Sequence, residues 1–404
     1  MTLGLYISVP FCRTKCSYCN FASDVFSKGA YEGYVARLLE DIAAAPRAAS
    51  ELGCQLPEEV NSIYLGGGTP SILNPEQLKR IFVAVRTQFA VAPDAELTVE
   101  CAPGTLTPSQ IETLLACGVN RVSLGVQSFV DQESHSVGRL HSRATVLDEI
   151  ARLRLAGVAN INVDLIAGVP HQTSESWTYS LREVIASGVP HASVYMLEVD
   201  EDSRLGRELI AGGTRYHAHF VPDEDAIADF YVEACATLNA AGIAQYEISN
   251  FARAGYEASH NLKYWTRQPY LGFGVDAHSM LVADRVAKDV TAIRFSQPDS
   301  LDGYMNHGAR TVTPVSQNAA LEESFFLGLR MNQGVNLDRM NSEFGRERVA
   351  AYSPVMEECF REGLLERMDA RVRLTSRGRM LSNEVFKGFL VEERVVGPTV
   401  PPSG

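Results

Sequence analysis

Short apolar stretches alternate within residues 1–250 with longer stretches in which apolar side chains recur every three or four positions. The short stretches are typical of buried strands, and the longer ones of helices that cover one face of a sheet. Strands are predicted at 3–9, 62–65, 97–100, 121–125, 160–165, 193–197 and 245–249. Helices are predicted at 31–45, 75–89, 107–118, 145–156, 174–187 and 223–241.

This alternation predicts parallel strands joined by right-handed crossovers, in either a barrel or a doubly wound sheet. The positions of unusual residues favour the barrel. A cysteine-rich loop, a triple glycine, Glu100, Gln127 and Asp164 each lie at or just after the end of a different predicted strand. Active sites of β/α barrels form at that edge. We therefore predict an α/β fold, a partial parallel (β/α) barrel whose mouth collects these residues.

The pattern changes twice after the predicted barrel, which spans residues 1–250. Residues 251–313 are polar and aromatic with little periodicity, so we expect a loop region and connection there. Helical spacing returns at 317–329, 337–344 and 349–362, followed by two short strands and a helix at 376–390. This order predicts a small α+β winged-helix-like domain at 314–395. The proline-containing tail, 396–404, is expected to be disordered.

Composition and charge narrow the class of protein. The chain has 404 residues, is 46% hydrophobic and 21% charged, and carries a net charge of -13, as in an ordinary globular protein. The acidic balance argues against nucleic acid or an anionic membrane as the main partner. Neither a signal peptide nor a transmembrane segment is expected, so we predict a cytoplasmic protein. The five cysteines beyond residue 20 are expected to be buried thiols rather than disulfides.

Three cysteines, Cys12, Cys16 and Cys19, stand within eight residues after the first predicted strand. Asn20 and Phe21 follow, so a fourth thiol is missing from the obvious place. A structural zinc site closes with four ligands, and a [4Fe–4S] cluster held by protein alone takes four cysteines. Three thiolates on one loop therefore leave a coordination position open to an exchangeable ligand.

The spacing Cys12-x3-Cys16-x-Tyr18-Cys19, together with Gly66-Gly67-Gly68-Thr69-Pro70, resembles the radical S-adenosylmethionine superfamily. The resemblance implies a [4Fe–4S] cluster on the three cysteines, with S-adenosylmethionine on the fourth iron. It also implies cofactor contacts at Tyr6, Gly67, Gly68, Thr69, Glu100, Gln127, Arg139 and Asp164. Taken singly, each such side chain is better explained by a structural hydrogen bond or surface ion pair. Their shared location at strand ends favours the cofactor.

Further motifs resemble the group that contains the oxygen-independent coproporphyrinogen III dehydrogenases and the HemW-type haem chaperones. These motifs are Gly125-Val126-Gln127-Ser128-Phe129, Gly138-Arg139-Leu140-His141, Asn162-Val163-Asp164-Leu165-Ile166 and Tyr246-Glu247-Ile248-Ser249-Asn250-Phe251. The dehydrogenases have another cysteine two residues after the third ligand, where this chain has Phe21. They also have a long N-terminal extension, whereas eleven residues precede Cys12 here. Both differences favour the chaperone type.

A last motif, His260-Asn261-Leu262-Lys263-Tyr264-Trp265, resembles the His-Asn-x-x-Tyr-Trp sequence associated with haem binding in these chaperones. The resemblance makes His260 a candidate axial ligand to haem iron, for which imidazole nitrogen is common. A histidine beside aromatic residues is equally a hydrogen-bonded core residue, and that alternative stays open. His278 is another candidate, and His217 and His219 are expected at the surface.

These observations favour a haem chaperone that binds the cluster, S-adenosylmethionine and haem as its cargo. Its expected partners are haem-receiving proteins and an electron donor to the cluster. The alternative is an oxygen-independent coproporphyrinogen III dehydrogenase, which would decarboxylate propionates by radical chemistry in a closed cavity. A nucleic-acid binder built on the winged-helix-like domain is disfavoured by the acidic balance. No residue is given a catalytic role, so the question of enzyme activity stays open between the first two hypotheses.

Overall fold

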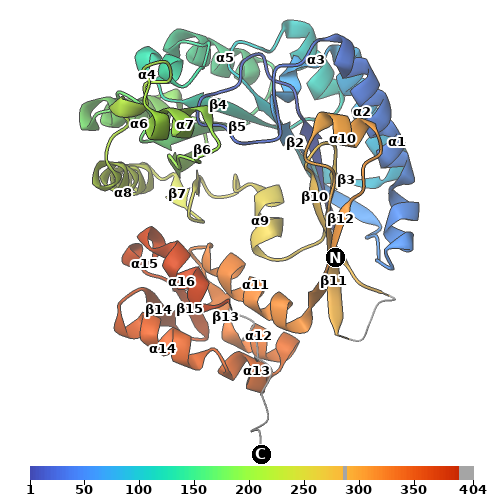
Figure 1. Ribbon diagram of the computed structural model, residues 1–404, viewed down its shortest axis with the longest axis vertical. Helices are drawn as coiled ribbons and strands as arrows, with labels where there is room; N and C mark the ends of the chain where they lie inside the picture. Colours follow the sequence, from blue (N-terminus) through green and yellow to red (C-terminus); the bar gives the residue numbers. More distant parts are fainter. Residues whose placement is uncertain (285–288, 391–404) are drawn as a thin grey trace, which may run out of the picture. The chain divides into compact units, whose positions relative to one another are not determined.

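The computed structural model describes residues 1–284 and 289–390, and the chain forms two compact units (Figure 1). The larger unit is Met1–Tyr264 with Gln268–Val315, and the smaller is Trp265–Arg267 with Ser316–Gly404. The tail predicted at 396–404 lies outside the described residues. None of the described helices is both long and apolar enough to cross a membrane.

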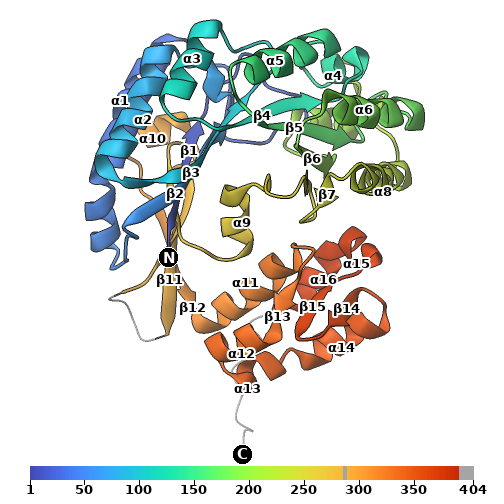
Figure 2. The same cartoon turned by 180° about the vertical axis from the view of Figure 1, so that it is seen from behind.

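A twelve-stranded sheet forms the larger unit, in the order β12-β11-β10-β9-β1-β2-β3-β4-β5-β6-β8-β7. Its first six strands are β1 (Leu3–Val9), β2 (Glu59–Gly67), β3 (Ala90–Cys101), β4 (Arg121–Gln127), β5 (Asn160–Ala167) and β6 (His191–Met196). They pair in parallel, as does β9 (Tyr270–Phe273) with β1. β12 and β7 stand at opposite ends of the order, so the described sheet is a curved, open barrel (Figure 2). The predicted α/β class and partial barrel are confirmed.

Alternation along the strands separates two faces of this sheet. Leu5, Leu65 and Val163 are fully buried and belong to its apolar face. The intervening positions carry polar side chains that the strand register brings side by side, with Glu100 opposite Ser123 and Asp164 opposite Ser193. The barrel interior is therefore polar at the level of the strand ends.

Long helices follow the strands and lie on the outside of the barrel (Figures 1 and 2). They are α1 (Gly29–Glu51), α2 (Pro75–Gln88), α3 (Pro108–Ala116), α5 (Arg143–Leu155), α6 (Ser174–Ser187) and α8 (Glu224–Ala240). Asn74 and Thr107 begin α2 and α3 with capping boxes, and Gly188 ends α6 in the left-handed conformation. α1 continues past Pro46, where the sequence predicted its end. Ala45 and Ala49 keep the helix face buried on both sides of Pro46, and this burial offsets the hydrogen bond that the proline removes.

Two shorter helices lie in loops at the carboxyl edge of the sheet, α4 (Asp131–Ser136) after β4 and α7 (Arg204–Ala211) after β6. The apolar pattern of the sequence predicts neither of them.

The prediction of one continuous strand at 245–249 is wrong. The structure has β7 (Ala244–Gln245), a turn, and β8 (Asn250–Ala252), which pairs antiparallel with β6 and with β7. The Tyr246 N–H donates to the Asn250 carbonyl oxygen at 3.1 Å across the turn. The Glu247 carboxylate accepts from the Ser249 N–H and from the Asn250 side chain. Hydrogen bonds to the Glu247 side chain therefore stabilise a turn here, in place of the backbone hydrogen bonds of an extended strand.

The prediction of a loop region at 251–313 is also wrong. It contains α9 (Ser259–Trp265), β9, β10 (His278–Val282), β11 (Val290–Ser296), α10 (Leu301–Met305) and β12 (Thr311–Ser316), and the strands extend the sheet beyond β1. The glycines that suggested a loop serve close packing instead. A Cβ at Gly272 would meet the His278 carbonyl oxygen, and one at Gly274 would meet the Tyr34 hydroxyl.

The smaller unit combines helices with a three-stranded antiparallel sheet, β13 (Val335–Asn336), β15 (Arg371–Leu374) and β14 (Leu365–Met368). Its helices are α11 (Gln317–Leu329), α12 (Leu337–Phe344), α13 (Arg346–Ala350), α14 (Ser353–Arg361), α15 (Ser376–Met380) and α16 (Ser382–Gly388). Phe325 and Phe389 stack in its core with ring centroids 4.7 Å apart. The helices predicted at 349–362 and 376–390 are each divided in two, and the predicted two-stranded ribbon gains a third strand.

Candidate functional site

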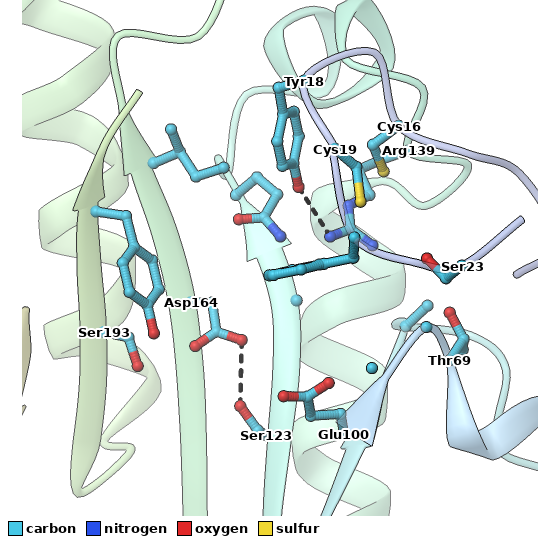
Figure 3. A pocket seen from close by; sticks show the side chains of 18 of the residues that line it. Cys16, Tyr18, Cys19, Ser23, Thr69, Glu100, Ser123, Arg139, Asp164 and Ser193 are labelled. Atoms are coloured by element: carbon cyan, nitrogen blue, oxygen red, sulfur yellow. Dashed lines mark hydrogen bonds between the residues drawn. The ribbon is translucent and has the colours of Figure 1, made fainter. Parts of the chain in front are cut away.

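The carboxyl ends of β1 to β6 surround a cavity of about 320 Å³ (Figure 3). Most of the residues predicted from the sequence line it: Cys12, Cys16, Cys19, Gly67, Gly68, Thr69, Glu100, Gln127, Arg139 and Asp164. Tyr6 does not line the cavity. Its ring packs on that of Tyr64, a lining residue, with centroids 6.2 Å apart. His260 and His278, the two haem candidates, also lie outside the lining.

The cysteine loop follows β1 and is fixed by hydrogen bonds to two neighbouring segments. The Cys12 N–H donates to the Asp24 carbonyl at 3.0 Å, and the Ser17 N–H to the Val137 carbonyl at 3.2 Å. The Thr14 hydroxyl donates to the Gly138 carbonyl at 3.0 Å. The loop therefore presents its thiols from a defined backbone.

Two properties of the thiols bear on what they can bind. Burial raises the pKa of Cys12 and of Cys19, so ligation would require a cation that favours the thiolates. Within the described residues, no group of three or more His, Cys, Asp or Glu side chains is arranged to hold a single metal ion. In a [4Fe–4S] cluster each thiolate binds a different iron, so the sulfurs need not converge on one point.

Glycine at the end of β2 allows the strand to lie against the cysteine loop. The Gly68 N–H donates to the Val9 carbonyl at 2.8 Å. A Cβ at Gly68 would lie 2.7 Å from the Phe11 carbonyl oxygen and 3.0 Å from the Cys12 sulfur. Gly67 has φ +99°, which disfavours other residues. Both glycines are therefore required by local geometry at the cavity wall.

Two carboxylates face the cavity from β3 and β5 (Figure 3). Glu100 accepts a 2.7 Å hydrogen bond from the Tyr64 hydroxyl, and burial raises its pKa to about 7. Asp164 accepts from the Ser123 hydroxyl at 3.1 Å and from the Asn162 amide at 2.7 Å. Burial also raises the pKa of Asp164. Buried acids held in this way suit a ligand that brings positive charge or hydroxyl donors.

Arg139 supplies positive charge to the same cavity. Its Nη2 donates to the Tyr18 hydroxyl at 3.1 Å, whereas its buried Nε makes no hydrogen bond within the described residues. A Cβ at Gly125 would lie 3.0 Å from Arg139 Nη2, so the glycine makes room for the guanidinium. An unpaired buried donor is costly, and a carboxylate ligand would satisfy it.

His260, the haem candidate, is an internal residue. It is 1% exposed, its Nδ1 is 3.0 Å from the Ser62 hydroxyl, and its Nε2 is 2.8 Å from the Tyr264 hydroxyl. Burial lowers the pKa of His260 to about 3, with Lys263 and Arg121 adding to the effect. Iron ligation would require the loss of one of these hydrogen bonds, so the structure favours the alternative of a hydrogen-bonded core histidine. His278 is exposed and lies 3.8 Å from Asp276.

Sequence reasoning missed several polar residues that hold the predicted ones. They include Tyr18, Tyr64, Ser123, Asn162 and Ser193, which also line the cavity. The signal was present in the strands, where polar residues alternate with apolar ones in segments that otherwise resemble fully buried strands. Each missed strand residue shares the interior face with a predicted contact.

Comparison with known proteins defines the class of this site. Residues 6–184 match the Radical SAM superfamily, and residues 315–381 match the HemN C-terminal domain. The fold is similar to that of coproporphyrinogen III oxidase (HemN) from Escherichia coli, with a TM-score of 0.79 and 22% identity over 96% of this chain and 90% of that one.

Curated relatives identify the family more closely. The heme chaperone HemW of Bacillus subtilis is 32% identical over 96% of this chain and 99% of the relative. The protein of the same name from Escherichia coli K12 is 30% identical over 96% and 98%. The chain belongs to the HemW family of radical SAM proteins.

Proposed function

We propose that this chain is a haem chaperone that holds a [4Fe–4S] cluster and S-adenosylmethionine in the barrel cavity, binds haem and passes it to recipient proteins. Full-length similarity to proteins named heme chaperone supports the proposal. The observation that carries it is that three free cysteines line one cavity together with Glu100, Arg139 and Asp164. Haem-receiving proteins and an electron donor are the partners that this function requires.

The donors in the cavity fit both cofactors. Cys12, Cys16 and Cys19 would ligate three irons of the cluster. Glu100 suits the ammonium of S-adenosylmethionine, and the unpaired Nε of Arg139 suits its carboxylate. When bound, the cluster would supply single electrons to S-adenosylmethionine.

Oxidative decarboxylation of coproporphyrinogen III is the alternative function. Phe21 bears on this choice because it lines the cavity and is 64% exposed, at the position where the dehydrogenases carry a cysteine. An exposed phenyl ring at the cavity mouth offers apolar contact to a ligand but no thiol. This residue favours the chaperone.

The proposal is tested with anaerobically reconstituted full-length protein. Cys16→Ala should abolish the visible absorption of the cluster, whereas Cys117→Ala, a change outside the cavity lining, should leave it intact. Wild-type protein loaded with haem should then transfer it to the apo form of a haem b protein, measured by the Soret band of the recipient. Absence of transfer, or sustained decarboxylation of coproporphyrinogen III, would refute the chaperone function.

A further inference from the structure

A second cavity of the larger unit, of about 590 Å³, lies against the cysteine loop. Arg13, Thr14 and Lys15, which separate the first two cysteines, line it together with Leu140 and Arg204. No Asp or Glu is among the described residues of its lining. This basic cavity therefore presents positive charge directly beside the proposed cluster.

The cations of the basic cavity make hydrogen bonds to neutral groups. Arg204 Nη1 donates to the Lys15 carbonyl at 3.3 Å, and Lys15 Nζ donates to the Phe21 carbonyl at 3.4 Å. Arg13 and Arg204 are exposed. A carbonyl oxygen carries no net charge, so these contacts position the cations without neutralising them.

The charge of the basic cavity is opposite to that of the chain as a whole, which is -13. Carboxylates on the flanking segments lie outside its lining and accept hydrogen bonds from other groups: Asp24 from the Val25 N–H, Asp131 from the Arg143 N–H and Asp200 from the Asn20 amide. A local group of cations on an acidic protein attracts acidic partners to that one place.

Two exposed apolar side chains also line the basic cavity. Val25 is 55% exposed and Leu140 is 70% exposed. Apolar side chains surrounded by polar ones mark interaction sites, and protein interfaces combine apolar contact with arginine. The combination suits a protein partner better than a small anion.

The basic cavity and the cofactor cavity share the cysteine loop as a wall. Thr14, Lys15 and Arg139 line both of them. The Thr14 hydroxyl donates to the Gly138 carbonyl at 3.0 Å, which fixes the loop between the two cavities. A partner seated in the basic cavity would contact the loop that carries the thiols without displacing a ligand from the cofactor cavity.

We propose that the basic cavity is the docking surface for a small acidic flavoprotein that passes one electron to the cluster. The inference rests on the proposed function, which requires an electron donor. The reduced flavin would lose one electron and the cluster would gain it, with no covalent bond formed or broken. Carboxylates of the carrier would pair with Arg13, Lys15 and Arg204, and the apolar edge of the flavin ring would pack on Val25 and Leu140.

Titration calorimetry of the full-length, reconstituted protein with an FMN-containing flavodoxin tests the docking surface. Wild-type affinity should fall between about 50 and about 200 mM salt. The double variant Arg13→Gln/Arg204→Gln should bind about three- to tenfold more weakly at low salt, with a smaller salt dependence. Arg182→Gln, which removes an exposed arginine of α6 outside the cavity, is the matched control and should bind like wild type.

The rate of cluster reduction gives a second measurement. Photoreduced flavodoxin should bleach the visible absorption of the cluster more slowly in the double variant than in wild type. Dithionite, which needs no docking surface, should reduce both proteins at the same rate. If Arg13→Gln lowers the cluster content, the comparison uses Arg204→Gln alone, since Arg204 lies outside the cysteine loop.

The outcomes separate this inference from the proposed function. Equal affinity and salt dependence in wild type and double variant would overturn the docking surface and leave the chaperone function standing. Binding of an acidic ferredoxin but not of flavodoxin would overturn the flavoprotein as the partner. Failure of the wild type to assemble a cluster would overturn both proposals.

Discussion

Glu100→Gln is the substitution whose effect can be worked out most directly from the structure. Burial raises the pKa of Glu100 from 4.5 to about 7, although the Tyr64 hydroxyl and the Gly67 backbone lower it in part. The charged carboxylate is therefore less favourable in the folded, ligand-free protein than in the unfolded chain. Glutamine keeps an oxygen that can accept from Tyr64 and removes the charge.

The sign and the size of the effect follow from linkage. Because the folded pKa is the higher one, the contribution of Glu100 to stability is full below pH 4.5 and is lost as pH rises through 7. At about 1.4 kcal/mol per pH unit, the loss is about 3 kcal/mol at most. The stability of Glu100→Gln relative to wild type should therefore increase by about 2 kcal/mol between pH 5 and pH 8.

Urea unfolding of the ligand-free protein at pH 5 and pH 8 measures this difference. Glu112→Gln, on the exposed face of α3, is the matched control. Its stability relative to wild type should be the same at pH 5 and pH 8. Glu100→Gln should also weaken S-adenosylmethionine binding, because the ammonium group of this ligand favours a charged carboxylate. The pH dependence of binding near pH 7 should disappear in this variant. An equal difference in stability at both pH values would refute the assignment of a neutral, buried Glu100.

Two further predictions concern packing. Gly68→Ala should lower stability by about 1–3 kcal/mol in urea unfolding and reduce cluster content, because its Cβ would lie 2.7 Å from the Phe11 carbonyl oxygen. Gly29→Ala is the control, since a Cβ there meets no atom closer than 3.9 Å. An equal loss of stability in Gly29→Ala would contradict a steric cause at Gly68. His260→Ala should lower stability by about 1–3 kcal/mol at pH 7, because the Ser62 and Tyr264 hydroxyls lose their partner. Since the pKa of His260 is lowered to about 3, the wild type loses stability as pH falls through 6.5, and the deficit should shrink at pH 5. A deficit that grows at pH 5 would contradict a neutral core histidine.

The parts of the fold that the sequence predicted depend on local patterns. Apolar runs followed by Gly or polar residues marked β1 to β6, and Pro75 and Pro108 marked the starts of α2 and α3. Because active sites of β/α barrels form at the carboxyl ends of the strands, Glu100, Gln127 and Asp164 could be predicted to line one cavity from their positions in the sequence alone. These correct predictions share one physical basis. The spacing of buried positions and the capping of helix ends both depend on residues that are close together in the sequence.

The missed parts depend on contacts between distant segments. Gly272 and Gly274 read as loop signals because the atoms that exclude a side chain there, from His278 and Tyr34, are supplied by tertiary packing. The burial of His260 depends on Ser62, which is 198 residues away in sequence. No local pattern distinguishes such a histidine from an accessible ligand.

Helix α7 shows how an element that the apolar pattern did not predict can matter for function. Its Leu209 and Ile210 are exposed, so its apolar residues do not form one buried stripe. Yet the Leu205 N–H donates to the Ser17 carbonyl in the cysteine loop at 2.8 Å, and Glu208 accepts from the backbone N–H groups of Tyr216 and Ala218. One short helix thus holds both the cysteine loop and the segment that follows the helix.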